Sequence, residues 1–441
     1  MKRALSRSIF LAALVATPAS AFASAFQLPD VDASATGRAG AVTANPNNPS
    51  AIWYNPAAVG ALEGVQIDIG FNVILPQFDF QAPDGTRTKA ESQNFFVPNL
   101  YATYKPLHWL AFGAGVAPTY GLGVKWPDSS PGRAQILEQT LQSFTISAMA
   151  ALDFSHWVDG LRVGGGIDLT PANVYLAKAV PLGTDSGSVA LNGTAFGIGG
   201  RVGVQFRPSY LYGVGLGVTY RSATDLTFAG NANFNAPPQY RTLLPPDGKG
   251  KTALTLPQNI SAGIGWRWRD RLELEVDVDW TNWSTSKSLN ISLPDNSVAV
   301  TPENWRDTIA LRIGGEYTFF QQLTIRLGYV YDQSPVPAST LTFALPDTDR
   351  SVLTGGVGYQ IIRQLRADLA AEFILPSSRK TGDAQYQPVV KGTYDVSAVV
   401  VGFNLVAKFG EPKPAVTRDE EPAVLAPAPA SMSIEEPASQ P

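Results

Sequence analysis

The sequence predicts a single transmembrane antiparallel β-barrel of about fourteen strands. Three observations lead to this prediction. Residues 271–283 alternate between apolar and acidic side chains without a break, similar runs recur along most of the chain, and the connections between the runs are short and long in turn. A closed wall with lipid outside and a polar lumen inside accounts for all three.

Residues 271–283 have the two-residue period of a β-strand. One face carries Leu272, Leu274, Val276, Val278 and Trp280, and the other carries Glu273, Glu275, Asp277 and Asp279. Unbroken aliphatic residues opposite a row of carboxylates are typical of a wall that faces lipid on one side. We interpret the carboxylates as charges on a solvated inner wall, partly matched by cations such as Arg326 and Arg366.

Composition excludes several classes of protein. The chain has 441 residues, of which 16% are charged, and no apolar run after the N-terminus is long enough for a transmembrane helix. Its composition stays uniform along the body of the chain, which favours one large architecture. A net charge of −4 provides no basic stripe for nucleic acid, and the lack of cysteine excludes thiol nucleophiles, zinc–thiolate sites and disulfides.

The first residues read as a cleaved signal peptide over residues 1–23. Lys2, Arg3 and Arg7 form a basic region, residues 9–15 form an apolar core, and residues 21–23 (AFA) fit the small-x-small cleavage rule. An uncleaved anchor is disfavoured because the apolar core is too short to span a bilayer. We therefore expect an exported chain that begins at Ser24.

Residues 24–62 lack alternation and are rich in Gly, Ala, Asn and Pro, a composition typical of turns and short helices. We interpret this segment as a plug inside the lumen. The barrel is expected over residues 63–409. Its fourteen strand-like runs begin near Val65, Gln93, His108, Ser143, Leu161, Ser188, Leu211, Lys251, Leu272, Asn304, Leu323, Ser351, Leu365 and Val389.

The connections alternate in length. Short turns include residues 105–108, 155–160, 207–210, 267–270, 320–322 and 362–364, whereas residues 82–92, 126–142, 229–250, 292–303 and 332–349 form longer links rich in Pro, Gly and Asp. This asymmetry is typical of outer-membrane barrels, with short periplasmic turns and long extracellular loops.

The last strand ends on the aromatic residue Phe409, as expected of a barrel that is inserted by the barrel assembly machinery into outer-membrane lipid. Residues 410–441 are then rich in Pro, Ala and Glu, a composition that predicts a disordered periplasmic tail. Because barrels of this kind ordinarily end with a strand, the tail is a departure from the pattern.

Catalysis is not expected. The two histidines, His108 and His156, each precede a Trp in a short turn, as interfacial residues do, and no pattern predicts a metal or cofactor. An open porin needs no plug, so the plug predicts transport by binding and release. We expect a monomer with passage as its function.

Several segments resemble the FadL-type outer-membrane long-chain fatty-acid transport proteins, a family that also includes aromatic-hydrocarbon transporters. The similar segments are residues 24–28 (SAFQL), 37–40 (GRAG), 55–57 (NPA), 120–122 (YGL), 256–257 (LP), 280–283 (WTNW), 332–337 (DQSPVP) and 346–350 (PDTDR). The last two are the most specific, and all occur in the family's order.

The resemblance implies an N-terminal hatch inside a fourteen-stranded barrel, and release of ligand sideways through a gap beside a kinked third strand. That strand would be residues 108–122, with Gly113, Gly115 and Pro118 as its breaks. The hatch motif Asn55, Pro56 and Ala57 would face the gap.

The resemblance also implies an apolar capturing groove and an interior cation for the ligand carboxylate. Ile136, Leu137 and Leu141, at helical spacing, are the groove candidates, and Lys178 and Arg306 are the candidate cations. The expected function is passive import of long-chain fatty acids or similar hydrophobic compounds. Uptake of monoaromatic hydrocarbons, and a structural barrel that anchors the envelope through its tail, are the alternatives.

Overall fold

The protein is described by a computed structural model over residues 25–383 and 390–410. The predicted signal peptide, the first mature residue Ser24 and the tail from residue 411 lie outside the described residues. Within the part of the chain that is described, no helix is long and apolar enough to cross a membrane.

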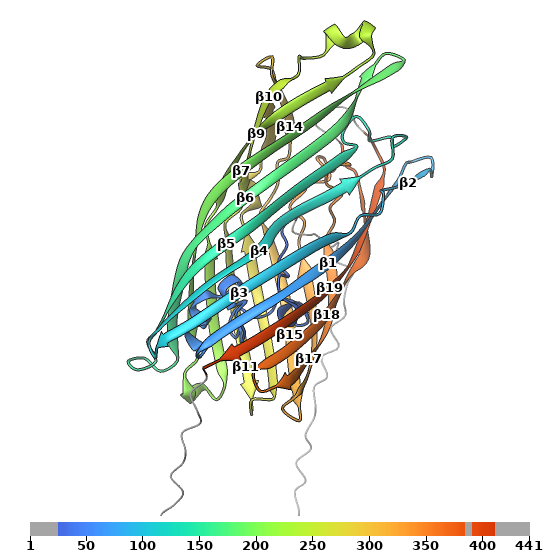
Figure 1. Ribbon diagram of the computed structural model, residues 1–441. Coiled ribbons are helices and arrows are strands. Elements are labelled where there is room, and N and C mark those ends of the chain that lie inside the picture. Colours follow the sequence, from blue (N-terminus) through green and yellow to red (C-terminus); the bar gives the residue numbers. More distant parts are fainter. Residues whose placement is uncertain (1–24, 384–389, 411–441) are drawn as a thin grey trace, which may run out of the picture.

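The chain forms one closed antiparallel β-barrel (Figure 1). Closure is made by β1 and β19, which pair along their whole length from Val65 with Phe409 to Gln81 with Thr393. The undivided wall strands are β1 (Val65–Gln81), β3 (Phe95–Leu107), β4 (Leu110–Lys125), β5 (Glu138–Asp153), β6 (Leu161–Leu182), β7 (Asp185–Phe206), β16 (Leu323–Asp332), β17 (Arg350–Ile362), β18 (Leu365–Lys380) and β19 (Thr393–Phe409).

Four further wall strands are each divided into two segments. They are β8 (Val214–Arg221) with β9 (Thr224–Asn235), β10 (Gly248–Leu256) with β11 (Asn259–Trp268), β12 (Leu272–Thr281) with β13 (Ser288–Ser292), and β14 (Val298–Pro302) with β15 (Thr308–Phe319). The short β2 (Arg87–Lys89) only extends the hairpin of β1. The wall therefore has fourteen strands, which confirms the predicted fold class.

The predicted strand starts agree with the wall strands to within a few residues. The two largest differences among the described starts are at the tenth wall strand, which begins with β14 at Val298 rather than near Asn304, and at β5, which begins at Glu138 rather than near Ser143. The predicted start at Val389 falls on a residue outside the described part, and β19 begins at Thr393.

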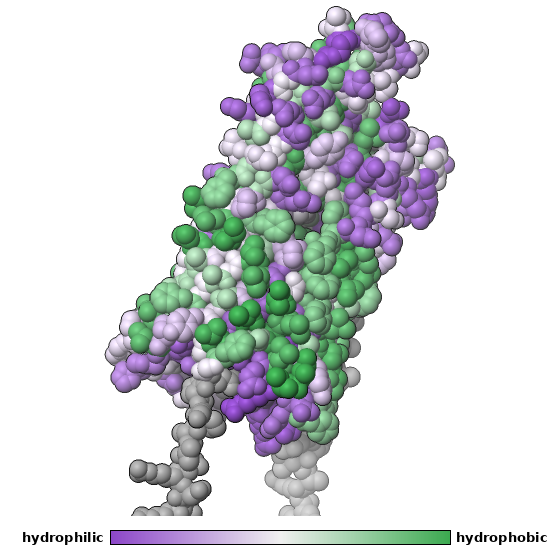
Figure 2. All heavy atoms as spheres, in the orientation of Figure 1, coloured by the Kyte–Doolittle hydropathy of each residue, from purple (hydrophilic) through white to green (hydrophobic). Residues whose placement is uncertain are grey.

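Alternation along β12 sets the two faces of the wall as predicted. Leu274, Val276 and Val278 point outward and are exposed, whereas Glu273, Glu275 and Asp277 are buried on the inner face. Figure 2 shows the resulting apolar band across the lower half of the face in view, with hydrophilic residues gathered at the upper end and at the lowest edge. An outward apolar band of this kind is the lipid-facing surface of a membrane barrel.

The two ends of the barrel differ. The short turns lie together at the lower end in Figure 1, whereas the hairpins at the upper end are longer, and that of β6 and β7 extends far. Short 3₁₀ segments occur in the connections: η2 (Ser209–Leu211), η3 (Pro238–Leu243) and η4 (Trp283–Thr285).

Residues 25–62, called the hatch from here on, lie inside the barrel (Figure 1). They include α1 (Ala33–Thr36), α2 (Ala51–Tyr54) and the 3₁₀ helix η1 (Pro56–Ala61). Asp32 caps α1 by accepting a hydrogen bond from the Ala35 N–H at 3.0 Å, and its carboxylate also accepts from Asn48 Nδ2 at 3.1 Å. Most hatch residues are buried, so the segment fills the lumen.

Candidate functional site

The acidic face of β12 holds the hatch in place. Arg38 Nη1 lies 2.8 Å from Glu273 Oε1, and the backbone N–H groups of Val42 and Thr43 both donate to Asp277 Oδ2 at 2.9 Å. The Ala44 N–H donates to Glu275 Oε1 at 2.5 Å. Charge-assisted bonds to backbone donors are among the strong hydrogen bonds in proteins.

The interpretation of these carboxylates as a solvated wall is therefore wrong. Glu273, Glu275 and Asp277 are 3%, 2% and 0% exposed. Arg326 and Arg366 do not match them, because both bind Asp368 at 2.8 Å. Hatch backbone groups bind Glu275 and Asp277, and the side chains of Arg38 and Arg267 bind Glu273. Alternation within one strand carries no information about these partners.

The hatch motif lies against β6 and β7. Asn55 Nδ2 donates to the carbonyls of Thr43, at 2.8 Å, and of Val204 in β7, at 3.1 Å, while its Oδ1 accepts from the Ala57 N–H at 3.1 Å. Pro56 packs on Gly164 of β6, where a Cβ would come within 2.5 Å of the Pro56 carbonyl. The expectation that the motif faces a gap beside the third strand is thus wrong.

The third wall strand is β4, and its pairing with β3 stops midway. The last paired residues are Leu100 and Val116, whereas β4 continues beside β5 as far as Lys125 and β3 stays paired with β1 from Phe95. The β4–β5 register is irregular between Pro118 and Tyr120. Proline has no N–H to donate to a ladder, so Pro118 lies where the wall opens.

Gly113 and Gly115 lie before that opening, in the part of β4 that pairs with both neighbours. At Gly113 a Cβ would lie 2.7 Å from the side chain of Ile52 in the hatch. The absence of a side chain there leaves room for the hatch and does not break the strand. The irregularity that borders the opening lies at Pro118.

The start of the hatch replaces the missing neighbour of β4 from inside. Gln27 forms an isolated antiparallel bridge with Tyr120, the Leu28 N–H donates to the Thr119 carbonyl at 2.9 Å, and the Gly121 N–H donates to the Phe26 carbonyl at 2.9 Å. A short strand-like segment thus closes the opening on its luminal side.

A cavity of about 280 Å³, the gap cavity, lies at this opening. It is lined by outward-facing residues such as Phe96, which is 65% exposed, and Phe144, and also by Gln27 and Tyr120 from the interior. The lining is mostly apolar, including Ile74, Phe95, Leu122 and Leu141. The cavity therefore connects the interior with the lipid-facing side of the wall.

Among the described residues that line the gap cavity, Arg350 is the only charged one. Its Nη2 donates to the Ala25 carbonyl at 3.1 Å and lies 3.5 Å from Asp347 Oδ1. Sequence reasoning missed Arg350 as a site residue. It belongs to residues 346–350, which had served only for the resemblance.

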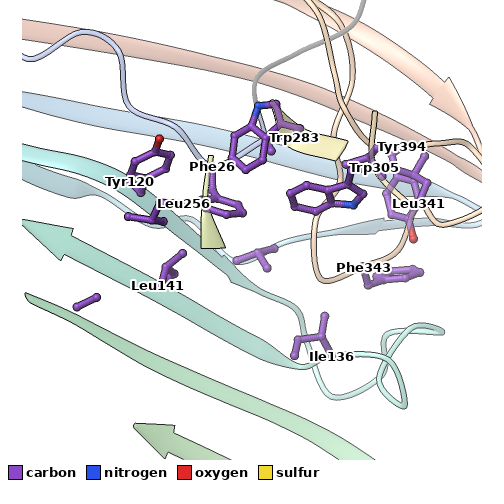
Figure 3. Close-up of a cluster of buried hydrophobic side chains, with 14 of the residues drawn as sticks. Phe26, Tyr120, Ile136, Leu141, Leu256, Trp283, Trp305, Leu341, Phe343 and Tyr394 are labelled. Atoms are coloured by element: carbon purple, nitrogen blue, oxygen red, sulfur yellow. The ribbon is translucent and has the colours of Figure 1, made fainter. Parts of the chain in front are cut away.

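A second cavity of about 110 Å³, the loop cavity, lies nearer the long connections and shares Leu122, Leu141 and Leu345 with the gap cavity. Around it lies an apolar cluster that includes Phe26 and Trp305 (Figure 3). The Glu303 side chain also lines it, and burial raises the pKa of this carboxyl to about 7. The two cavities form an apolar route past Leu141.

The groove candidates do not form a helix. Residues 131–135 are turns, and Leu141 belongs to β5. Ile136 is buried in the apolar cluster, Leu137 donates its N–H to Ala177, and Leu141 lines both cavities. The helical spacing was misleading because β5 extends further than its alternation indicated.

The two candidate cations lie elsewhere. Lys178 and Arg306 are exposed, and neither lines the gap cavity or the loop cavity. The Arg306 N–H donates to the Pro335 carbonyl at 3.1 Å. The structure does not bring the two side chains together around one cavity.

One further cavity and the two histidines add no reactive centre among the described residues. A polar cavity of about 50 Å³ between the hatch and the wall, lined by Arg201, Arg221 and Arg312, is too small for an amphiphile. His108 and His156 lie in the short turns after β3 and β5. Within the described ranges, no group of three His, Cys, Asp or Glu residues is placed to hold a metal ion.

A closed apolar-belted barrel with a filled lumen and a cavity through its wall defines an outer-membrane transport protein. The chain belongs to the family described as outer membrane protein transport protein (OMPP1/FadL/TodX), whose model matches residues 12–409. This confirms the family resemblance, the outer-membrane location and a transport rather than an enzymatic class.

Curated relatives cover most of the chain. The 47 kDa outer membrane protein of Pasteurella multocida is 26% identical over 430 residues, 92% of this chain and 98% of the relative. The long-chain fatty acid transport protein of Escherichia coli K12 is 23% identical over 433 residues, 88% of this chain and 95% of the relative.

Solved structures share the fold. A Pseudomonas aeruginosa FadL homologue has a TM-score of 0.80 at 19% identity and covers 88% of this chain and 100% of its own. The toluene transporter TodX of P. putida has a TM-score of 0.70 at 18% identity, with 87% and 100% covered. At these identities the likeness concerns the fold alone.

Proposed function

We propose that this protein imports long-chain fatty acids or similar hydrophobic compounds across the outer membrane by passive diffusion, with release sideways between β3 and β4. The observation that carries the proposal is the gap cavity, whose lining runs from Gln27 in the interior to Phe96 on the lipid-facing side. The named function of the Escherichia coli relative supports the same substrate class.

Lateral release is favoured by the hydrophobic effect. Each methylene that leaves water is stabilised by about 0.8 kcal/mol. An acyl chain that passes from an apolar cavity directly into lipid keeps this stabilisation, because it is not exposed to water on the way. An exit along the barrel axis would instead lead through the hatch, which is buried and bonded to β12 by Arg38 and by the backbone of residues 42–44.

The proposed route begins in the loop cavity, passes Leu141 and ends in the gap cavity. The hatch motif Asn55, Pro56 and Ala57 would keep the rest of the hatch fixed, and only residues 26–28 would have to move. The end of the barrel with the short turns would face the periplasm, together with both termini. The chain would act as a monomer after insertion by the barrel assembly machinery.

A reversible cross-link tests the route. Gln27 and Tyr120 lie opposite each other between two backbone hydrogen bonds, one from Leu28 to Thr119 and one from Gly121 to Phe26. They therefore form a non-hydrogen-bonded pair, whose short Cα–Cα distance suits a disulfide. The chain contains no cysteine, so a Gln27→Cys, Tyr120→Cys variant has one possible disulfide.

Uptake of labelled oleate by cells that lack their own transporter is the measurement. The oxidised double variant should take up little oleate, and a reductant should restore uptake to the level of the single variants. Equal uptake in the oxidised and reduced states would refute lateral release through this opening. Uptake of labelled toluene without oleate would keep the route and favour the aromatic alternative.

The anchor alternative concerns residues 411–441, which lie outside the described residues. A chain that ends at Gly410 should import oleate normally if transport is the function. Normal uptake with a damaged envelope would favour a separate anchoring role for the tail.

A further inference from the structure

We propose that Arg350 binds the carboxylate of the transported amphiphile in the gap cavity, in competition with the backbone carbonyl of Ala25. This inference rests on the proposed function and deepens it, because it selects anionic amphiphiles over neutral hydrocarbons. It also replaces Lys178 and Arg306 as the expected cations.

The first argument is that Arg350 provides a single charge in a cavity lining whose other described residues are uncharged. Arg350, at the start of β17, is the only charged residue among the described residues that line the gap cavity. Its side chain is 22% exposed, so the guanidinium is accessible from the cavity. Within the cavity the guanidinium is therefore the group that an anionic ligand head would bind.

The second argument is the spare hydrogen-bonding capacity of the guanidinium. A guanidinium has five N–H donors in a planar fork that fits a carboxylate in a bidentate manner. Of the contacts that it makes with described residues, the hydrogen bond to Ala25 and the longer contact to Asp347 both use Nη2. Nε and Nη1 therefore remain for a ligand.

Three carboxylates interact electrostatically with Arg350, those of Asp30, Asp347 and Glu372, but none of them lines the gap cavity. Asp347 accepts a hydrogen bond from Ser334 Oγ at 2.5 Å and approaches Arg350 only at 3.5 Å, and neither Asp347 nor Asp349 lines the cavity. The closest partner of the guanidinium is the neutral Ala25 carbonyl. An ionised ligand carboxylate is a stronger acceptor than an amide carbonyl and would displace it.

Displacement of Ala25 has a structural consequence. Ala25 directly precedes residues 26–28, which close the opening beside β4 through two backbone hydrogen bonds. Loss of the Arg350 contact removes the adjacent tether of this segment. Binding of a carboxylate would thereby favour opening, whereas a neutral chain of equal length would not.

Equilibrium binding to the purified full chain tests the head-group role, with labelled oleate and labelled oleyl alcohol as matched probes. Charged hydrogen bonds contribute roughly tenfold to a hundredfold in affinity. In Arg350→Gln, the Kd for oleate should rise at least about tenfold on that basis, while the Kd for the alcohol stays within about twofold. Arg350→Lys keeps the charge but not the planar fork, so its Kd for oleate should lie between those of the native chain and of Arg350→Gln, which separates loss of the head-group contact from misfolding.

Cysteine labelling tests the competition. Ala25 is buried, so an Ala25→Cys variant should react slowly with a maleimide. Oleate should accelerate labelling, oleyl alcohol should not, and the Arg350→Gln background should abolish the difference. A cysteine at the buried Ala58, further along the hatch, should stay protected throughout.

Other outcomes overturn the inference. Equal weakening of oleate and oleyl alcohol would assign Arg350 a structural role, and selective weakening in Lys178→Gln or Arg306→Gln would move the carboxylate site. Oleate binding that is unchanged in Arg350→Gln would refute the inference but leave fatty-acid import standing. A native chain that binds neither probe would refute both.

Discussion

Arg38 of the hatch and Glu273 of β12 form an ion pair at 2.8 Å in which both side chains are almost completely buried. The two residues are far apart in sequence, and the pair connects the hatch to the wall. Glu273 also binds Arg267 Nη2 at 2.6 Å, so it serves two cations. Loss of one partner leaves the other in a poorly solvated place.

Arg38→Met should loosen the hatch without unfolding the barrel. Removal of one partner of a buried ion pair costs about 3–5 kcal/mol. We expect faster hydrogen exchange at residues 33–45. The shift in gel mobility between unheated and heated samples, which reports an intact barrel, should not change. Glu63→Gln is the matched control, because its partner Lys105 pairs with a half-exposed carboxylate and such pairs contribute about 0–1 kcal/mol. Equal effects of both variants would contradict the prediction.

Gly164→Ala should displace the hatch motif. The added methyl group would come within 2.5 Å of the Pro56 carbonyl, so the backbone of η1 must move. Overpacking of this kind costs about 1–3 kcal/mol. The measurement is hydrogen exchange of residues 55–61. Gly355→Ala in β17, where the nearest atoms lie 3.8 Å away, should leave the same amides protected.

Pro118→Val should narrow the opening between β3 and β4. Valine restores a backbone N–H and favours strand geometry, so further ladder bonds become possible. We expect oleate uptake to fall several-fold at equal amounts of inserted protein. Pro171→Val in β6, a strand proline beyond the gap cavity, provides the comparison and should leave uptake unchanged. Unaltered uptake in Pro118→Val would show that the irregularity does not limit passage.

Glu303 should make the local stability of the segment between β14 and β15 depend on pH. Burial raises the pKa of its carboxyl from 4.5 to about 7, so the folded state favours the neutral acid. The local stability is then highest below the unfolded pKa of 4.5 and decreases as pH rises toward 7. Hydrogen exchange at residues 298–307 should be roughly 70-fold faster, relative to the intrinsic rate, at pH 8 than at pH 5.

Glu303→Gln is the control for this pH dependence. The amide has nearly the same shape and does not titrate, so the local slope should disappear. Asp347 and Asp349, whose pKa values burial raises to about 6 and about 7, titrate in the same direction but lie before β17. A slope at residues 298–307 that persists in Glu303→Gln would assign it to them.

The wall could be predicted because it depends on a local rule. A strand between lipid and lumen must alternate apolar and polar side chains, and the run Leu272–Thr281 shows this alternation at nearly every residue. Closure and strand number then follow from counting the runs. Where a strand continues beyond the lipid, alternation weakens. The predicted start of β5 therefore lies after its observed start at Glu138.

The site could be predicted only in part, because its contacts join distant segments. Pro118 was identifiable since proline interrupts a ladder on its own. Arg350 was not, because its significance comes from Ala25 at the other end of the chain and from an apolar lining contributed by several strands. The same holds for Asp277, whose backbone partners in the hatch have no signature in side-chain sequence.

The interrupted pairing beside β4 also implies how the transporter resets itself. When residues 26–28 leave, Thr119 loses the donor of Leu28 and Gly121 loses the acceptor of Phe26. Unpaired backbone groups near lipid are costly, so the vacated edge would attract residues 26–28, which remain tethered beside it. On the proposed route the opening would therefore close by itself after each passage, without any input of energy from the cell.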